Sequence, residues 1–229
     1  MALLLGGANV ALAEESGGFV GIGIGGGDTE LKIKVSGADN AEWLTSETSA
    51  DKIKFSGIGY GFVVGYKQFF TPYLGLRYYA NLDLHHNLTK FEELNESTDN
   101  YENKREDITL INYGVNVDFL GNFVVTDIAD FGGFIGLGIG ANTIKGKSSW
   151  IQSAKSGAAE IGGKFNDTAF DVWLNVGLRT NIATNHGVEL VARVPFLPIK
   201  MIDLEVADGS YQYTFRQTYN ILARYTFSF

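Results

Sequence analysis

Residues 211–229 decide the fold, and they read YQYTFRQTYNILARYTFSF. The odd positions are mainly aromatic or aliphatic, from Tyr211 to Phe229, whereas the even positions are mainly polar and include Arg216 and Arg224. Successive side chains on a strand point to opposite faces, so this stretch predicts one long strand with an aromatic face and a polar face. Aromatic residues near both ends, with smaller ones between them, are typical of a strand that crosses a bilayer.

The alternative for this stretch is an edge strand of a soluble β-sandwich. So long an exposed aromatic edge would pair with other chains and aggregate, which favours the membrane interpretation. A last strand of alternating aromatics that ends in phenylalanine also resembles the assembly signal of bacterial outer-membrane proteins. Tyr225, Phe227 and Phe229 are the residues of that signal here, and the partner that it implies is the outer-membrane assembly machinery.

Composition excludes several other classes of protein. The chain has 229 residues, which suits one all-β domain, and it contains no apolar run of about 18 residues that would form a transmembrane helix. The absence of cysteine excludes disulfides and thiolate chemistry. A net charge of −8 argues against binding to nucleic acid, which requires a basic face.

The N-terminal segment predicts export. Residues 1–13, MALLLGGANVALA, combine an apolar core with a small-residue end, as a signal peptide cleaved after Ala13 would. The positively charged start of such a peptide is missing, because no lysine or arginine precedes Lys32. Residues 14–229 are then the mature domain.

Alternating stretches recur along this domain and predict eight strands. Most approach the roughly 9–11 residues that a tilted strand needs to cross the hydrocarbon core. Long polar connections alternate with shorter ones, as extracellular loops alternate with periplasmic turns. An open sheet edge is not tolerated in lipid, so the sheet must close into an all-β, eight-stranded, antiparallel, transmembrane up-and-down barrel with four long extracellular loops. The expected strands are 19–25, 55–70, 73–85, 108–120, 131–144, 165–180, 188–194 and 211–229, and the expected long loops are 36–51, 86–107, 145–164 and 195–210.

Gly21, Gly23 and Gly26 match the GxGxxG pattern of dinucleotide-binding proteins. That site requires a helix directly after the glycines, whereas the next residues, DTELKIKV, are strand-like. Inward glycines instead make room for bulky side chains across a narrow lumen. No cofactor or metal is expected.

The polar faces of the strands predict a charged lumen. An eight-stranded barrel is filled by its own side chains or holds one small ligand. Because unpaired charge in so narrow a space is costly, we expect a paired, hydrogen-bonded plug, and the alternative is a narrow ion path lined by arginines. The predicted lumen-lining network consists of Lys67, Arg77, Asp83, Asp118, Asp171, Arg179, Glu189, Arg193, Arg216 and Arg224.

Catalysis has one candidate pair. Some eight-stranded outer-membrane barrels modify lipid A at the membrane rim, and His85 with Asp83 would be a base with an orienting acid. His86 lies beside them at the expected end of the third strand. No serine stands out as a nucleophile, and a solvated histidine at a loop boundary explains the position equally well. No enzymatic activity is therefore expected.

Three stretches resemble the Helicobacter outer membrane protein family: GYKQFFTPYLGLRYYANLDLHHN at 65–87, NYGVNVDFLGNF at 112–123 and FDVWLNVGLRTNIATNHGVELVARVPFLP at 170–198. The resemblance implies an outer-membrane β-barrel, and members of the family serve as adhesins or porins. Larger members carry a cysteine-containing extracellular domain, which has no counterpart here. This chain thus looks like a small member, and the family offers no catalytic residue to transfer.

The sequence favours an integral protein of the bacterial outer membrane with a structural or surface-interaction role, similar to adhesion, carried by its loops. A narrow, low-conductance porin is the alternative, and a lipid A-modifying barrel is a distant third. The expected partners are outer-membrane lipid, lipopolysaccharide, the assembly machinery and an unidentified host or surface ligand.

Overall fold

The computed structural model describes residues 14–36, 52–95, 100–126, 128–146, 163–206 and 209–229, together with 151–152, 155–156 and 159. At 89–95 and 100–106 it describes the backbone alone. The expected signal peptide, 1–13, lies outside the described residues, as do nearly all of the first expected loop and much of the third.

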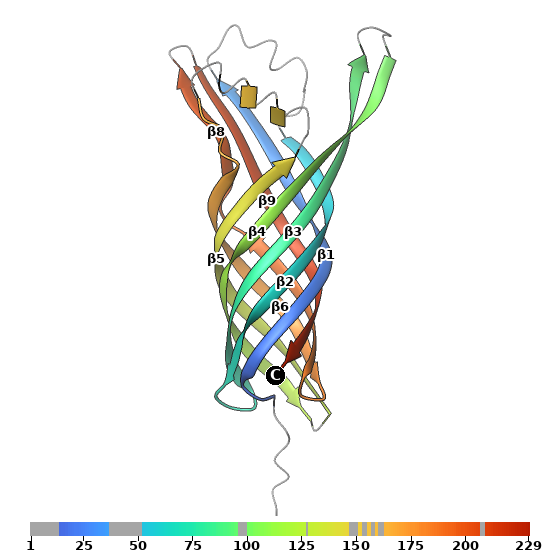
Figure 1. Cartoon of the computed structure of the whole chain (residues 1–229), viewed down its shortest axis with the longest axis vertical. Helices are drawn as coiled ribbons and strands as arrows, with labels where there is room; N and C mark the ends of the chain where they lie inside the picture. The colour runs from blue at the N-terminus through green and yellow to red at the C-terminus, as the bar shows by residue number, and fades with distance from the viewer. Residues whose placement is uncertain are drawn as a thin grey trace, which may run out of the picture.

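The described chain is an antiparallel β-barrel (Figure 1). Each strand pairs with the next in sequence from β1 to β7, β9 pairs with β7 and β8, and the β1–β9 ladder closes the barrel. Closure leaves no open edge within the wall, as lipid requires. The strands are β1 (Gly17–Ser36), β2 (Lys52–Phe69), β3 (Leu74–Asn95), β4 (Asn100–Val125), β5 (Ala129–Gly146), β6 (Thr168–Ile182), β7 (His186–Pro195), β8 (Ile199–Val206) and β9 (Gly209–Ser228).

The outer surface of the barrel is a continuous apolar belt. Ile22, Phe62 and Leu137 are each more than half exposed, while the residues beside them in sequence point into the barrel. Large apolar side chains exposed in such numbers would be unstable in water and are stable in lipid. No helix among the described residues is long and apolar enough to cross a membrane.

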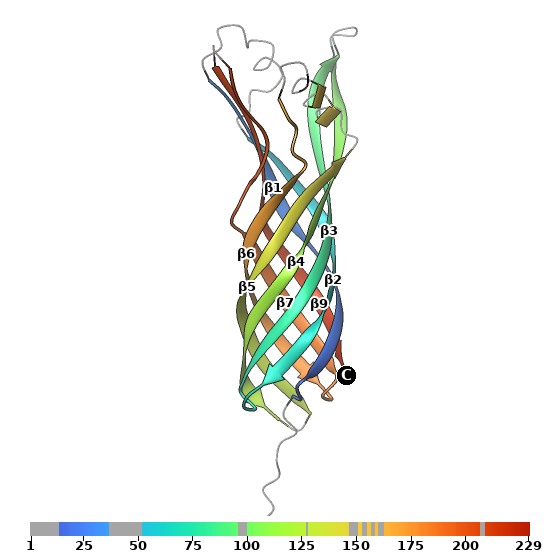
Figure 2. The same ribbon diagram turned by 60° about the vertical axis from the view of Figure 1, so that its left-hand side comes forward.

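One end of the barrel has the short connections and the other has the long ones. The short-connection end has the connections at 70–73 and 183–185 and the one between Val125 and Ala129, and the chain also ends there at Phe229 (Figures 1 and 2). Short turns face the periplasm in outer-membrane barrels, which places the long connections outside the cell.

The fourth expected loop, 195–210, is wrong in part, because it contains β8. β9 pairs with β7 through His186–Arg193 and then with β8, so β8 continues the course of β7 after an interruption at 196–198. Prolines at 195 and 198 flank the interruption, and proline cannot donate to a ladder. Ile199 and Met201 of β8 are buried, which supplies the apolar contact that a loop would lack.

The second expected loop, 86–107, is also wrong, because it forms a long β-hairpin. β3 and β4 remain paired up to Asn95 and Asn100. The charged composition suggested a loop, but two strands already in register extend by backbone hydrogen bonds whatever their side chains. β2 pairs with β3 only as far as Leu88, and β5 pairs with β4 only from Ile108, so no other strand that the structure describes pairs with the outer part of the hairpin (Figure 1).

Arg216 does not line the lumen, contrary to the sequence-based prediction. It is exposed, whereas Gln217 beside it is buried. Tyr219 pairs with Asp28 and Gln217 pairs with Thr29, so β9 carries one extra residue, Thr218, opposite β1. A β-bulge of this kind reverses the alternation beyond it. From Asn220 to Ser228 the even positions face inward as predicted, and below 218 the odd positions do.

Single cysteines test this reversal, since the protein has none of its own. We expect Arg216→Cys to react readily with a membrane-impermeant maleimide added to the folded barrel, because its side chain is outside. Gln217→Cys should react many times more slowly, because that side chain is buried. Mass spectrometry of the labelled barrel measures both rates, with unfolded protein as the control for full labelling. Faster reaction at position 217 would contradict the bulge.

Candidate functional site

The lumen is the candidate site, since it gathers most of the charged residues that the sequence singled out. Each of the nine remaining members of the predicted network is at most 6% exposed. They come from β2, β3, β4, β6, β7 and β9. These nine are Lys67, Arg77, Asp83, Asp118, Asp171, Arg179, Glu189, Arg193 and Arg224.

Glu14 pairs with two cations at the periplasmic end. It precedes β1, is 3% exposed, and forms ion pairs with Lys67 of β2 and Arg179 of β6. Arg179 also donates to Asn122 Oδ1 at 3.3 Å and lies 5.6 Å from the ring centre of Phe69. One carboxylate therefore joins two strands from different parts of the wall.

Arg77 is the centre of the middle layer. Its Nη2 donates to Asp118 Oδ2 at 2.7 Å, and its Nη1 donates to Glu189 Oε1 at 2.5 Å. Arg224 Nη1 reaches the other oxygen of Glu189 at 3.4 Å, so the layer has two arginines and two acids. The Arg77 guanidinium also lies 4.6 Å from the ring centre of Phe134, a contact that favours the charged form.

Asp83 and Arg193 form the third ion-paired group, on the extracellular side of the middle layer. Arg193 also donates to Asn175 Oδ1 at 3.0 Å and to Asn112 Oδ1 at 2.8 Å. A ladder of buried amides continues from there, because each asparagine both donates and accepts. Its members are Asn81, Asn112, Asn116, Asn142 and Asn175.

Asp171 is bound differently from the other acids, since no described cation pairs with it. Its Oδ2 accepts from Asn142 Nδ2 at 2.6 Å. Its Oδ1 accepts from the backbone N–H groups of Val172 at 2.7 Å and Leu197 at 2.9 Å. Asp171 therefore anchors the interruption between β7 and β8 to β6.

Apolar clusters fill the lumen beside the charges. The largest lies at the extracellular end and consists of Leu31, Phe55, Ile108, Leu110, Ile144, Ile151, Ile199, Met201 and Phe215. Leu120, Phe134, Val191 and Leu222 form a second, and Phe19, Val63 and Tyr79 a third. The described lumen is thus packed by polar and apolar side chains in alternating layers.

Trp173 depends on glycines in the strands beside it. It is fully buried, and its Nε1 donates to Asn116 Oδ1 at 2.6 Å. A Cβ added to Gly138 would lie 2.0 Å from Trp173 Nε1, so only glycine leaves room for the indole. Gly138 therefore makes room for a bulky side chain of the strand with which it pairs, not for one across the lumen.

The two histidines of the catalytic hypothesis point in opposite directions. His85 is buried in the lumen, with its Nε2 3.1 Å from Asn220 Nδ2. His86 is outside, 3.0 Å from Thr109 Oγ1 through Nδ1 and with its ring against Tyr60. Asp83 bonds Arg193 and Asn81, not an imidazole. Among the described side chains, no group of three histidine or acidic residues is arranged to hold a metal ion.

The residues of the expected assembly signal point outward at the periplasmic end. Tyr225, Phe227 and Phe229 are all exposed. The Tyr225 hydroxyl lies 2.7 Å from His186 Nδ1, and the backbone N–H of Phe229 donates to Gly18 O at 2.9 Å.

The sequence-based network omitted Glu14 and Trp173. Trp173 lies two residues from both Asp171 and Asn175 on the same strand, so the alternation that predicted their inward position also indicated that of Trp173. Glu14 lies before the first strand, where alternation carries no information, and only an excess of inward cations pointed to a missing acid.

Comparison with known proteins identifies relatives of this barrel. Residues 61–229 match the family model described as Helicobacter outer membrane protein. No curated protein sequence matches the chain. The outer membrane protein OprG from Pseudomonas aeruginosa is 12% identical, with 95% of this chain and 98% of that chain covered and a TM-score of 0.47. Neisserial surface protein A is also 12% identical, with 94% and 100% covered and the same TM-score. The protease OmpT from Escherichia coli is 8% identical, with 93% and 97% covered and a TM-score of 0.39.

Glu14→Gln tests the pairing at the periplasmic end. Removing this charge leaves Lys67 and Arg179 buried without a counter-charge, which we expect to destabilise the barrel by about 3–5 kcal/mol. Urea unfolding of the protein in lipid vesicles measures the change. Glu15→Gln is the matched control, since Glu15 is exposed and its loss should change little. Equal stability of the two variants would show that Glu14 does not hold the layer together.

Gly138→Ala tests the packing of Trp173. The added methyl group forces the indole to move, with an expected cost of about 1–3 kcal/mol and a change in tryptophan fluorescence. Gly121→Ala is the control, because a Cβ there has no atom within 4 Å. Unfolding of both variants at the same urea concentration would contradict the tight packing of Trp173 against Gly138.

Proposed function

The chain belongs to the Helicobacter outer membrane protein family and is a β-barrel of the bacterial outer membrane, and from this premise we propose that it is a sealed barrel whose extracellular β3–β4 hairpin contacts an external partner. The role is one of surface interaction, and the barrel serves as a rigid support. The observation that carries the proposal is the combination of a filled lumen with a hairpin that extends beyond the wall.

The filled lumen supports a function other than conduction through the barrel. Three ion-paired groups cross it, centred on Glu14, Arg77 and Arg193, and the cluster containing Phe55 and Phe215 lies at its extracellular end. A conducting path would require several of these contacts to separate. Separating a buried ion pair exposes each charge to a large desolvation cost, so spontaneous opening is disfavoured.

The hairpin supplies a surface for binding. Its seven outermost pairs run from Thr89 with Glu106 to Asn95 with Asn100, and no further strand among the described residues pairs with either side there. Free strand edges present unpaired N–H and C=O groups to a partner chain. Residues 86–107 contain seven acids and three bases, so a basic partner fits the hairpin best.

A narrow pore remains the second candidate, favoured by one observation. Several buried lumen atoms have no hydrogen-bond partner in the described protein, including Asp83 Oδ1, Arg193 Nη2 and Arg224 Nη2. Buried groups of this kind usually bind internal water. A continuous file of such water would provide a path for protons or small ions.

An enzymatic role has the least support. A base and its orienting acid must be hydrogen-bonded and must face a substrate. His85 lies inside the wall beside Asn220, and Asp83 is paired with Arg193. We therefore propose a non-enzymatic barrel, inserted by the outer-membrane assembly machinery through its exposed C-terminal aromatics and surrounded by outer-membrane lipid and lipopolysaccharide.

Shortening the hairpin tests the surface role. Residues 89–106 are replaced by a two-residue Asn-Gly turn, which suits an antiparallel pair. Bacteria that display the shortened barrel should lose adhesion to cultured cells and to an immobilised lysine-rich peptide, while the barrel keeps its heat-dependent shift in gel mobility. A second variant keeps the hairpin length and exchanges its acids for glutamine and asparagine. Undiminished adhesion of the shortened protein would refute the role proposed for the hairpin.

A further inference from the structure

The outer face of β8, β9, β1 and β2 has a basic region directly above the apolar belt. We call it the basic rim, and its exposed or partly exposed members are Lys32, Lys34, Lys54, Lys200 and Arg216. Three acids with described side chains lie among them, Asp28, Glu30 and Asp203. The rim is therefore net positive, although the whole chain has a net charge of −8.

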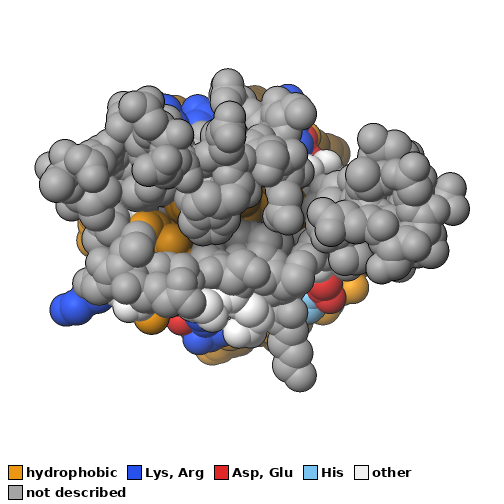
Figure 3. Space-filling model, turned by 90° about the horizontal axis from the view of Figure 1, so that it is seen from above, with side chains coloured by type: hydrophobic (Ala, Val, Ile, Leu, Met, Phe, Trp, Pro, Cys, Tyr) orange, Lys and Arg blue, Asp and Glu red, His pale blue; other side chains and the backbone are white. Residues whose placement is uncertain are grey.

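Strand register places the cations in adjacent rows. Glu30 of β1 pairs with Lys54 of β2 on one side and with Arg216 of β9 on the other. In the next row, Lys32 and Lys200 each pair with Thr214. The two cations of each row are separated by one strand, which is about 10 Å, and their long side chains can converge on one phosphate. Seen from the extracellular end, lysine and arginine side chains stand out at the edge of the molecule (Figure 3).

All three acids of the rim have partners, and two of those partners are rim lysines. Lys32 lies 3.3 Å from Glu30. Asp28 accepts from Ser56 Oγ at 2.7 Å and from the Tyr219 hydroxyl at 3.0 Å. Lys200 lies 2.8 Å from Asp203, and this hydrogen bond lowers the pKa of the Asp203 carboxyl. Arg216 forms no ion pair with any residue that the structure describes. It faces outward only because of the bulge at Thr218.

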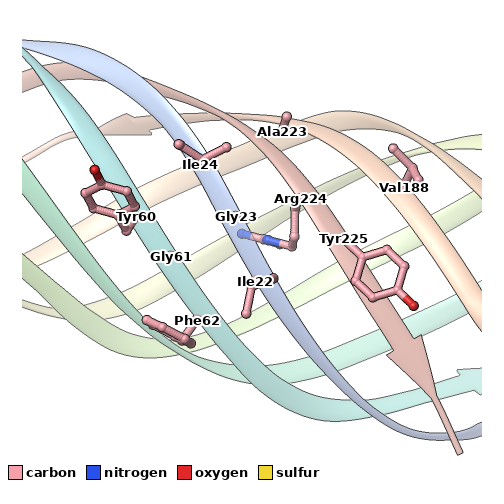
Figure 4. Close-up of a pocket in the computed structure, with 10 residues that line it drawn as sticks. All are labelled: Ile22, Gly23, Ile24, Tyr60, Gly61, Phe62, Val188, Ala223, Arg224 and Tyr225. Atoms are coloured by element: carbon pink, nitrogen blue, oxygen red, sulfur yellow. The ribbon is translucent and has the colours of Figure 1, made fainter.

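An apolar groove lies below the rim on β9, β1 and β2. Its volume is about 490 Å³, and exposed side chains such as Ile22, Phe62 and Tyr225 form its sides (Figure 4). The groove exists because Ala223 stands in a row with Tyr60, Ile24 and Leu190, where it is the smallest side chain.

The spacing between groove and rim matches one leaflet. Seven residues separate Ala223 from Arg216, which is about 23 Å along a strand. A strand tilted by roughly 45° covers about 16 Å of that along the membrane normal, close to half of the roughly 30 Å hydrocarbon core. A molecule with its headgroup at the rim would therefore place an acyl chain in the groove.

We propose that the basic rim and the groove together form a binding site for a phosphorylated lipid of the outer leaflet. The rim cations contact the phosphate, and the groove over Ala223 holds an acyl chain. A soluble phosphate would use the rim alone, whereas the continuity of rim and groove on β9, β1 and β2 favours a lipid. This site is independent of the role proposed for the β3–β4 hairpin.

Spin-labelled lipids test the site in the refolded, full-length barrel. The probes are phosphatidic acid and phosphatidylcholine, each labelled on an acyl chain, in phosphatidylcholine vesicles. Electron paramagnetic resonance measures the immobilised fraction of each probe. We expect the wild-type protein to prefer phosphatidic acid, and Lys54→Gln with Arg216→Gln to reduce this preference by about fivefold for each charge removed.

Two control variants separate the site from general effects. Lys145→Gln with Lys164→Gln removes the same charge from exposed positions elsewhere and should leave the preference unchanged. Ala223→Phe fills the groove and should reduce immobilisation of both probes, whereas Ala80→Phe, on the outer face of β3, should not. Gel mobility before and after heating confirms that each variant is folded.

Three results would overturn the proposal: no preference for phosphatidic acid in the wild-type barrel, equal losses in the two charge variants, or equal effects of the two phenylalanine substitutions. Inorganic phosphate added to the vesicles distinguishes the source of the ligand. The lipid site predicts no displacement of phosphatidic acid, because free phosphate lacks an acyl chain. Displacement by phosphate alone would assign the rim to a soluble anion and contradict the lipid proposal.

Discussion

The structure depends on one constraint, which is that lipid offers no partner to an unpaired backbone group or a buried charge. The β1–β9 ladder pairs the backbone groups that would otherwise be open to lipid, because it joins the two ends of the sheet over most of the length of both strands. The aromatic and aliphatic side chains of the outer face then contact lipid. The same alternation sends the polar side chains inward, so the wall and the lumen network are consequences of one sequence pattern.

The requirement that every buried charge has a partner explains how the lumen is filled. Each buried cation of the three ion-paired groups meets a carboxylate, and Glu14 and Glu189 each pair with cations from two different strands. Buried ion pairs contribute little net stability compared with apolar packing, but removing one partner is costly. The network therefore fixes which strands face one another across the lumen, while Trp173 and the apolar clusters supply the packing.

The alternation of apolar and polar residues predicted the strands well but predicted their ends and irregularities poorly. It predicted the inward position of nine charged residues but failed at Arg216, because the single extra residue at Thr218 changes neither composition nor hydropathy and yet reverses the face. It ended the third strand near His85, because charged residues are rare in strands, although backbone pairing continues to Asn95. Glu14 was missed because it lies outside any strand. Pairing across the lumen, as between Asp83 and Arg193, depends on barrel closure and cannot be read from local sequence.

The central claim is that the lumen is sealed, and the most direct test is the conductance of the purified, refolded barrel in a planar lipid bilayer. Insertion is established by heat-dependent gel mobility and by protection of the apolar strands from protease. We expect a silent bilayer at neutral pH, because the contacts around Glu14, Arg77 and Phe215 fill the described part of the lumen. Discrete conductance steps from the wild-type protein would contradict it and would favour the narrow pore.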